Sequence, residues 1–301
     1  MWLFVLFMCT AWGIALLRFC FDYGLVEMGN LRGVPVKCER HATFRAHTTA
    51  ILLSAKMRNF MQRFPLEHTP IDHVRIVAVK MFNAQTVGFI HCELHGIDSS
   101  CTCVTIRGDT TATVQRILTP SYDVCVAVVN PRPAVGGARP APFMAPLLRS
   151  LVTPKTKTAH VDDGEALCAA VRGAHIVIEA VAGMMDECEL SSSEQATLEC
   201  QEETGETVRQ IDLSRAAPPF GTSQGLLDEQ TTLWCSTRKL PSDDYVEEYL
   251  ANMKSDLMIT NGNADEGECT LKVLVPTAWL HLVGDGKLHV AQAHFMREDA
   301  L

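Results

Sequence analysis

Short runs rich in valine and isoleucine divide the chain from Val74 onward, and each run is interrupted by glycine, proline, asparagine or aspartate. β-branched residues favour extended backbone, and runs of this length suit strands better than helices. The strands predicted from these runs are 74–82, 112–119, 123–130, 173–183 and 271–275. Only two stretches, 192–204 and 243–256, show a helical period. The sequence therefore predicts a domain of the α/β class.

The size and charge of the chain narrow the classes of protein to which it can belong. It has 301 residues, of which 47% are hydrophobic, so it can bury the core of one large domain or two modest ones. The formal net charge is −9 and no cluster of lysine and arginine is present, which argues against a nucleic acid as partner. Twelve cysteines are scattered from Cys9 to Cys269 in apolar or strand-like stretches, so we expect reduced, mostly buried thiols and no disulfide framework.

Two segments fall outside the pattern of strands and helices. Residues 131–146 hold five prolines and two glycines and predict a loop or an insertion. Residues 1–17 carry no charge, which fits a signal peptide or a short membrane anchor, although the usual preceding basic residues are missing. A disordered leader or an upstream start in the gene model is the alternative. Because the rest of the chain has an intracellular character, a cytoplasmic location is predicted, with a membrane anchor or secretory entry through residues 1–17 as the alternative.

The helix predicted at 192–204 carries three glutamates on one face. A serine among residues 191–193 can cap this helix, and Gly205 ends it. Spacings of three and four residues place the glutamates on the same side: Glu199, Glu202 and Glu203. Such a face is either a solvated acidic surface or a site for a hard divalent cation, because Mg²⁺ in proteins is held by carboxylates together with substrate phosphates.

At this point the sequence resembles a known family. Residues 182–205, AGMMDECELSSSEQATLECQEETG, are similar to the Nudix box, Gly-x5-Glu-x7-Arg-Glu-hydrophobic-x-Glu-Glu-x-Gly. Members of that family are Mg²⁺-dependent hydrolases of nucleoside diphosphates linked to another group. The residues on the fixed positions of the box are Gly183, Glu189, Glu199, Glu202, Glu203 and Gly205. One extra residue separates Glu189 from Glu199, as in the longer box of the UDP-sugar pyrophosphatase branch.

The resemblance continues outside the box. Four further segments are similar to the ADP-sugar and UDP-sugar hydrolases and occur in the same order: 124–135, 177–183, 222–236 and 263–276. Together the likeness covers roughly residues 115 to 290. It implies that four residues bind the substrate: Arg132, Glu179, Asp228 and Glu229. For Arg132 the alternative is an ordinary surface arginine in a proline-rich turn.

The resemblance also implies a set of metal ligands and a general base. Glu199 and Glu203 are the first candidates for ligands and Glu202 the third, with the backbone carbonyl of Ala182 as a further ligand; the expected ion is Mg²⁺, and Mn²⁺ is possible. Hydrolysis of a pyrophosphate needs such an ion, because the phosphate oxygens repel an anionic nucleophile. The candidate catalytic residues are Glu203, Glu266 and Glu268. For the last two the alternative is a solvated acidic turn.

Two positions depart from the box. Leu198 stands where the family has an arginine, so the cation that orients a box glutamate is missing. Glu206 stands where an apolar residue is usual. Neither departure removes a metal ligand, but the first predicts looser carboxylates and a weakened or inactive enzyme.

A second constellation, HCELHGIDSSCTC at 91–103, invites an interpretation as a zinc site. Its cysteines are spaced Cys-x-Cys and not Cys-x2-Cys, and on a strand His91 and Cys92 point to opposite faces. A hairpin with buried cysteines is therefore predicted in preference to zinc.

The fold predicted by the resemblance is the α/β/α Nudix sandwich with a mixed sheet. Its domains are a hydrophobic leader at 1–36, a β-rich segment at 37–115 and the Nudix domain at 116–301. In this branch the β-rich segment commonly makes a dimer contact, so a homodimer is implied. Three functions stay open: hydrolysis of UDP-glucose or a related nucleotide sugar, hydrolysis of ADP-ribose or an ADP-sugar, and a catalytically silent nucleotide-binding module.

Overall fold

The computed structural model describes residues 24–82, 85–129, 145–152, 165–166, 169, 177–185, 190–221, 228–254, 260–261 and 270–301. The chain divides into two compact units. The N-terminal unit comprises residues up to Gly108 together with Ser223–Glu229, and the C-terminal unit comprises Asp109–Thr222 and Gln230–Leu301. None of the helices in the described ranges is long and apolar enough to cross a membrane. The predicted leader at 1–17 lies outside those ranges.

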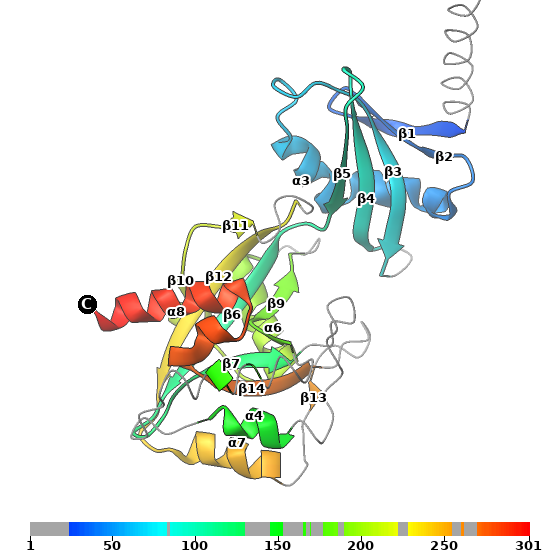
Figure 1. The fold of residues 1–301 in the computed structure, drawn as a ribbon. Helices are drawn as coiled ribbons and strands as arrows, with labels where there is room; N and C mark the ends of the chain where they lie inside the picture. The colour runs from blue at the N-terminus through cyan, green and yellow to red at the C-terminus, as the bar shows by residue number, and fades with distance from the viewer. Residues whose placement is uncertain are drawn as a thin grey trace, which may run out of the picture. The chain divides into compact units, whose positions relative to one another are not determined.

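The N-terminal unit is built on a mixed five-stranded sheet with the order β1-β2-β3-β4-β5 (Figure 1). Its strands are β1 Leu25–Leu31, β2 Val34–Glu39, β3 Ile71–Met81, β4 Val87–Gly96 and β5 Cys101–Ile106. Only β2 and β3 pair in parallel; the other neighbours are antiparallel. A parallel pair needs a long crossover. Here it contains the 3₁₀ helix η1 Thr43–His47 and the helices α2 Thr48–Leu53 and α3 Ala55–Arg63.

One face of this sheet is covered and the other is open. Along β4, Ile90, Cys92 and Leu94 are buried in a core that also contains Met57 and Met61 of α3. Because strand side chains alternate between the two faces, Glu93 and His95 lie on the other side, where they are only half-buried. This alternation leaves a polar face on β3, β4 and β5 that is accessible to solvent.

The described strands of the C-terminal unit form one mixed sheet with the main order β10-β12-β6-β7-β14-β13, while β11 pairs with β12, β8 with β7 and β9 with β6 (Figure 1). The strands are β6 Thr110–Leu118, β7 Asp123–Val129, β8 Ile178–Glu179, β9 Val181–Met184, β10 Ser214–Arg215, β11 Phe220–Gly221, β12 Gln230–Lys239, β13 Thr260–Asn261 and β14 Thr270–Pro276. The helices are α4 Ala145–Ser150, α6 Ser192–Thr204, α7 Asp244–Lys254 and α8 Gly286–Asp299, with 3₁₀ helices η4 Gln210–Asp212 and η6 Thr277–Leu282.

Strand β6 shows how helices come to lie on both faces of this sheet. Thr111 and Thr113 donate hydrogen bonds to the carbonyls of Ser192 and Ala196 in α6, at 2.9 and 3.2 Å. Arg116 points to the other face of the strand, because side chains alternate, and it binds Asp299 at the end of α8. A strand covered on both sides is apolar or fully bonded along its length, and eight of the nine β6 residues are buried. The predicted α/β/α sandwich with a mixed sheet is therefore confirmed.

The predicted elements agree with the structure in part. The runs 112–119, 123–130 and 271–275 correspond to β6, β7 and β14, and the helical period at 192–204 is α6. The prediction of only two helical stretches is wrong, because α3 and α8 are helices as well. The buried face of α8 includes His294 beside Phe295. A polar residue on the buried face interrupts the apolar period by which a helix is recognised.

The predicted boundaries differ from the division into compact units. Strand β1 lies inside the range 1–36 that was predicted as a leader. The two units divide between Gly108 and Asp109, and not at 115/116, because β6 pairs with β12 from Thr110 onward. The predicted loop at 131–146 overlaps the first two residues of α4, and its other residues lie outside the described ranges.

Candidate functional site

The helix α6 has well-defined ends. Ser191 caps its N-terminus: the Ser191 hydroxyl accepts from the Glu194 N–H at 3.3 Å, and the Glu194 carboxylate accepts from the Ser191 N–H at 2.8 Å. The Ser191 hydroxyl also donates to the Glu194 carboxylate at 2.7 Å, and this hydrogen bond, together with the one from the Ser191 N–H, lowers the pKa of Glu194. Gly205 ends the helix in the left-handed region, with φ of 72°, a conformation that glycine adopts without strain. The two caps set where α6 begins and ends.

Glu203 is buried against β9. It is 2% exposed, and its Oε2 accepts a hydrogen bond from the backbone N–H of Ala182 at 3.2 Å. The same turn is tied to β14, because the Thr270 hydroxyl donates to the Glu203 carbonyl at 2.9 Å. An ionised carboxylate is costly to bury unless hydrogen bonds or positive charge compensate it. The burial of Glu203 is therefore unlike that of a solvated acidic face.

Glu199 lies one turn earlier and contacts the next residue of β9. Its Oε1 accepts from the Gln195 side-chain amide at 2.7 Å. A Cβ atom on Gly183 would overlap the Glu199 carboxylate. Gly183 is therefore required here by the close approach of a side chain to the strand. Gln195 was not predicted as a site residue, although its position four residues before Glu199 on the helix could have indicated it.

The third glutamate differs from the other two. Glu202 is exposed, and within the described ranges no hydrogen bond or ion pair of its side chain occurs. Leu198, four residues earlier, is 42% exposed. An arginine at that position would lie within reach of Glu202 in the i,i+4 arrangement.

The residues at this place fit a hard divalent cation. Glu203 and Glu199 contact the adjacent backbone positions Ala182 and Gly183, so their carboxylates lie against the same short piece of β9. The ligands that the two glutamates offer are oxygen atoms, which Mg²⁺ prefers. The carboxylates and the glycine cradle together form a candidate metal centre.

Glu206 is held by residues from three other elements. It is 8% exposed and pairs with Lys272 of β14 at 2.7 Å and with Arg238 of β12 at 3.7 Å. The Tyr245 hydroxyl of α7 donates to Glu206 at 2.7 Å. Burial raises the pKa of Tyr245, and the negative charge of Glu206 raises it further. The charge at this position is thus compensated inside the fold.

A pocket of about 500 Å³ lies beyond the C-terminal end of α6. Its lining comes from β6, β12 and the segment after α6: Gln115, Thr207, Val208, Arg209, Asp212, Ser236, Thr237, Arg238 and Lys239. Gln115 and Ser236 are each 4% exposed. The Gln115 Oε1 and the Ser236 Oγ have no hydrogen-bond partner in the described part of the chain. These two buried polar atoms lower the stability of the unit unless something else compensates them.

The other predicted site residues are placed as follows. Glu179 is half-buried in β8, opposite Val128 of β7. Asp228 and Glu229 belong to the N-terminal unit. There Glu229 pairs with the Arg107 guanidinium at 3.0 Å, and Asp228 accepts from the Arg107 N–H at 2.9 Å. Four predicted residues lie outside the described ranges: Arg132, Glu189, Glu266 and Glu268.

The hairpin of β4 and β5 corrects one expectation about the cysteines. His91 and Cys92 do lie on opposite faces, with His91 exposed and Cys92 buried. Cys101 and Cys103, however, are exposed, so the predicted burial of the cysteines in this hairpin is wrong for both. The reason is that alternate residues of a strand share a face, and Cys101 and Cys103 both lie on the face of β5 that is open to solvent.

Comparisons with known proteins gave similarities to solved structures. No family model matches the chain, and no curated protein matches it. Among solved structures the chain is similar to the crystal structure of an ADP compounds hydrolase, with 13% sequence identity and a TM-score of 0.39. The match covers 77% of this chain and 94% of that chain. A similarity at this level carries no argument about the function of the chain.

Proposed function

We propose that the C-terminal unit is a Nudix-type hydrolase that cleaves the pyrophosphate bond of a nucleoside diphosphate linked to a sugar, with Mg²⁺ as cofactor. The observation that carries the proposal is the packing of Glu199 and Glu203 against Ala182 and Gly183. Two carboxylates of α6 that lie against the same short piece of strand offer oxygen ligands to a cation that also binds an anionic substrate.

Each residue of the centre has a role in this proposal. Glu199 and Glu203 hold the cation, with Glu202 as an outer ligand and the Ala182 carbonyl as a further one. When bound, Mg²⁺ would neutralise phosphate charge and lower the pKa of an attacking water. The Ala182 N–H and the Gln195 amide fix the directions of the two inner carboxylates. Glu203, Glu266 or Glu268 would accept the proton of the water, and Arg132 and Glu179 would contact the substrate.

The proposed substrate is UDP-glucose, cleaved to UMP and glucose 1-phosphate. Its support is the sequence resemblance, in which the extra residue between Glu189 and Glu199 matches the longer box of the UDP-sugar branch. ADP-ribose and ADP-sugars are the alternative substrates for the same machinery. A homodimer through the N-terminal unit would be seen as a doubled mass in light scattering.

The test compares two glutamates of the same helix. The full chain is assayed with Mg²⁺ against a panel of nucleotide sugars and ADP-ribose, and released monophosphate is measured. Glu203→Gln should lower turnover by about 10² to 10³, the usual effect of removing one charge-stabilising group from a site. Glu194→Gln is the control, because glutamine also serves at this position of a capping box. Equal activity of the two variants, or full activity of the wild type in excess chelator, would contradict the proposed metal centre.

A catalytically silent nucleotide-binding module is the second candidate. Leu198 favours it, because Glu202 is exposed without the cation that the box normally supplies. If the wild type hydrolyses nothing in the panel but binds a nucleotide in calorimetry, the silent module is supported. Leu198→Arg should then restore hydrolysis if the missing cation is the cause, since the exposed position accepts the longer side chain.

A further inference from the structure

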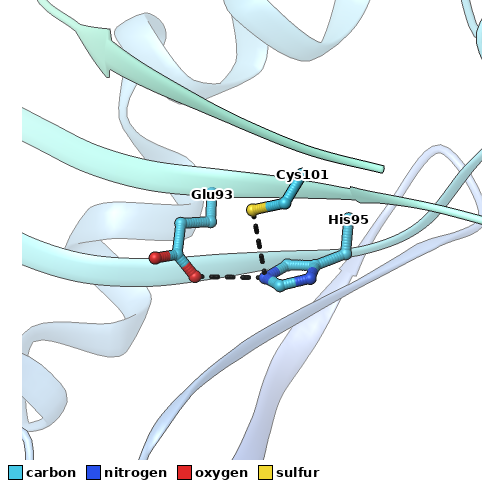
Figure 2. A group of neighbouring side chains, drawn as sticks. All are labelled: Glu93, His95 and Cys101. Atoms are coloured by element: carbon cyan, nitrogen blue, oxygen red, sulfur yellow. Dashed lines mark hydrogen bonds and ion pairs between the residues drawn. The ribbon is translucent and has the colours of Figure 1, made fainter. Parts of the chain in front are cut away.

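The open face of the N-terminal sheet brings together three different metal-ligating side chains. Antiparallel pairing of β4 with β5 sets His95 opposite Cys101, and Glu93 lies two residues before His95 on the same face. Figure 2 shows the carboxylate of Glu93, the imidazole of His95 and the thiol of Cys101 directed toward one another. Glu93 and His95 are half-buried and Cys101 is exposed, so an ion has access from solvent.

The distances fit one coordination sphere. The Glu93 Oε2 lies 3.1 Å from the His95 Nε2, and the Cys101 Sγ lies 4.0 Å from the same nitrogen. One donor atom from each of the three residues lies within 4.8 Å of the others. In a tetrahedral zinc centre, bond lengths of about 2.0 Å to nitrogen and about 2.3 Å to sulfur place neighbouring donors roughly 3.4 to 3.6 Å apart. The observed separations lie on both sides of this range, so small side-chain rotations suffice.

We propose that Glu93, His95 and Cys101 form a binding site for a thiophilic divalent cation, with Zn²⁺ as the ion that fits the donor set. Imidazole, thiolate and carboxylate are the ligands that proteins offer to zinc, whereas Mg²⁺ and Ca²⁺ take oxygen ligands alone. Three protein ligands leave a fourth position for water. The site is independent of the carboxylates on α6 and of the function proposed for them.

Neighbouring side chains hold two of the ligands in position. The His73 ring stacks on His95 with the centroids 4.4 Å apart and an angle of 6° between the planes, which fixes the direction of the His95 ring. Arg75 binds Glu93 at 3.1 Å. The positive charge of Arg75 repels a bound metal ion. Arg75 also pairs with Glu39 at 2.6 Å, and the Glu39 carboxylate compensates that charge. Such outer contacts typically contribute to metal affinity by orienting the ligands.

The experiment uses the full chain carrying Glu203→Gln, which weakens the cation site proposed on α6. Zn²⁺ is titrated in competition with a chromophoric chelator, and Co²⁺ is used as a spectroscopic probe for thiolate ligation. We expect one tight equivalent of Zn²⁺ and a sulfur-to-cobalt charge-transfer band. His95→Gln and Glu93→Gln should weaken Zn²⁺ binding by at least about tenfold, and Cys101→Ser should also remove the band.

Matched controls lie on the same face of the same hairpin. His91 is an exposed histidine of β4 that bonds the Thr105 hydroxyl at 2.8 Å, and Cys103 is an exposed cysteine of β5. His91→Gln and Cys103→Ser should keep the cobalt band and the zinc affinity. All five substitutions are at exposed or half-buried positions, and unchanged thermal melting without metal would show that the variants fold. The proposal is overturned if the chain carrying Glu203→Gln alone shows no thiolate band, or if Cys103→Ser weakens binding as much as Cys101→Ser.

Discussion

Replacing Gly183 with alanine should displace the Glu199 carboxylate while leaving the fold intact. The added Cβ would overlap that carboxylate, which is the far end of a flexible side chain and can move away. Its departure breaks the 2.7 Å hydrogen bond from Gln195, a loss of about 1 kcal/mol. Alanine in place of glycine within a strand returns roughly 0.5 to 1 kcal/mol through the lower entropy of the unfolded chain. The free energy of unfolding should therefore change by less than about 1 kcal/mol.

The same substitution should have a large effect on the proposed chemistry. A carboxylate moved off β9 no longer shares a cation with Glu203, and the loss of one such group typically lowers turnover by about 10² to 10³, or roughly 3 to 4 kcal/mol of activation free energy. The assay is released monophosphate for Gly183→Ala, together with urea unfolding and Mg²⁺ titration.

Gly286→Ala is the matched control, because a Cβ at the first residue of α8 meets nothing within 4 Å. This control should gain roughly 0.5 to 1 kcal/mol of stability and keep its activity. The reasoning about Glu199 is refuted if Gly183→Ala keeps more than about half of the wild-type turnover. A drop in the free energy of unfolding of more than about 2 kcal/mol would also refute the reasoning. Such a cost would mean that the Glu199 side chain cannot move away and that the backbone is displaced instead.

Three further predictions concern stability, each measured by urea unfolding. Arg116→Met should lower the free energy of unfolding by about 3 to 5 kcal/mol, because Arg116 is 5% exposed and its loss leaves the partly buried Asp123 without a cation. A cost below about 1 kcal/mol would show that the pair is exposed to water. Ser236→Ala should raise stability by about 1 kcal/mol, since the buried hydroxyl has no partner in the described residues, whereas the control Ser214→Ala loses a bond to His294 at 2.9 Å and should lower stability by a similar amount. Burial raises the pKa of Cys92 from its ordinary value of 9.0 to about 12. The stability contributed by the neutral Cys92 thiol is therefore complete below pH 9.0, and it falls as the pH rises from 9.0 toward about 12, at up to about 1.4 kcal/mol per pH unit. The free energy of unfolding should fall less steeply with pH in Cys92→Ala. Equal slopes in the two proteins would contradict the burial argument.

The parts of the fold that could be predicted from sequence are those in which a local pattern and the tertiary environment agree. Strand β7 is buried at six of its seven positions, and its continuous valine-rich run indicates a central strand. Helix α6 has both caps in its own sequence, so its bounds could be predicted to the residue. Helix α8 could not be predicted, because its buried face includes His294, which bonds Ser214 on a different element. The partner that makes a buried polar residue acceptable is not visible in a local pattern.

The residues of the candidate metal centre could be predicted from sequence, but the burial of each one could not. The sequence ranks Glu199 and Glu203 ahead of Glu202 as ligands but gives no burial for any of them, whereas the structure makes Glu199 half-buried, Glu202 exposed and Glu203 buried. This difference depends on how α6 lies against β9, which is a tertiary property. The zinc interpretation of the hairpin was set aside on the spacing of its cysteines along the chain. The donors that do converge, His95 and Cys101, are neighbours across two strands, so their proximity depends on strand register.

The two positions at which the sequence departs from its resemblance to the Nudix box have opposite structural consequences. At Leu198 the box would have an arginine and this chain has an apolar residue, on a helix surface where Glu202 has no partner in the described ranges. At Glu206 an apolar residue is replaced by a charged one, and three elements contribute groups that compensate it: Arg238, Tyr245 and Lys272. Such a network requires several matching side chains, and a chance substitution would leave a buried charge unpaired at a cost of several kcal/mol. Glu206 is therefore an integrated part of this fold, which ties the end of α6 to β12, α7 and β14. Among the described residues Leu198 has no comparable network around it, so the exposed end of the carboxylate face is where the proposed activity is most open to change.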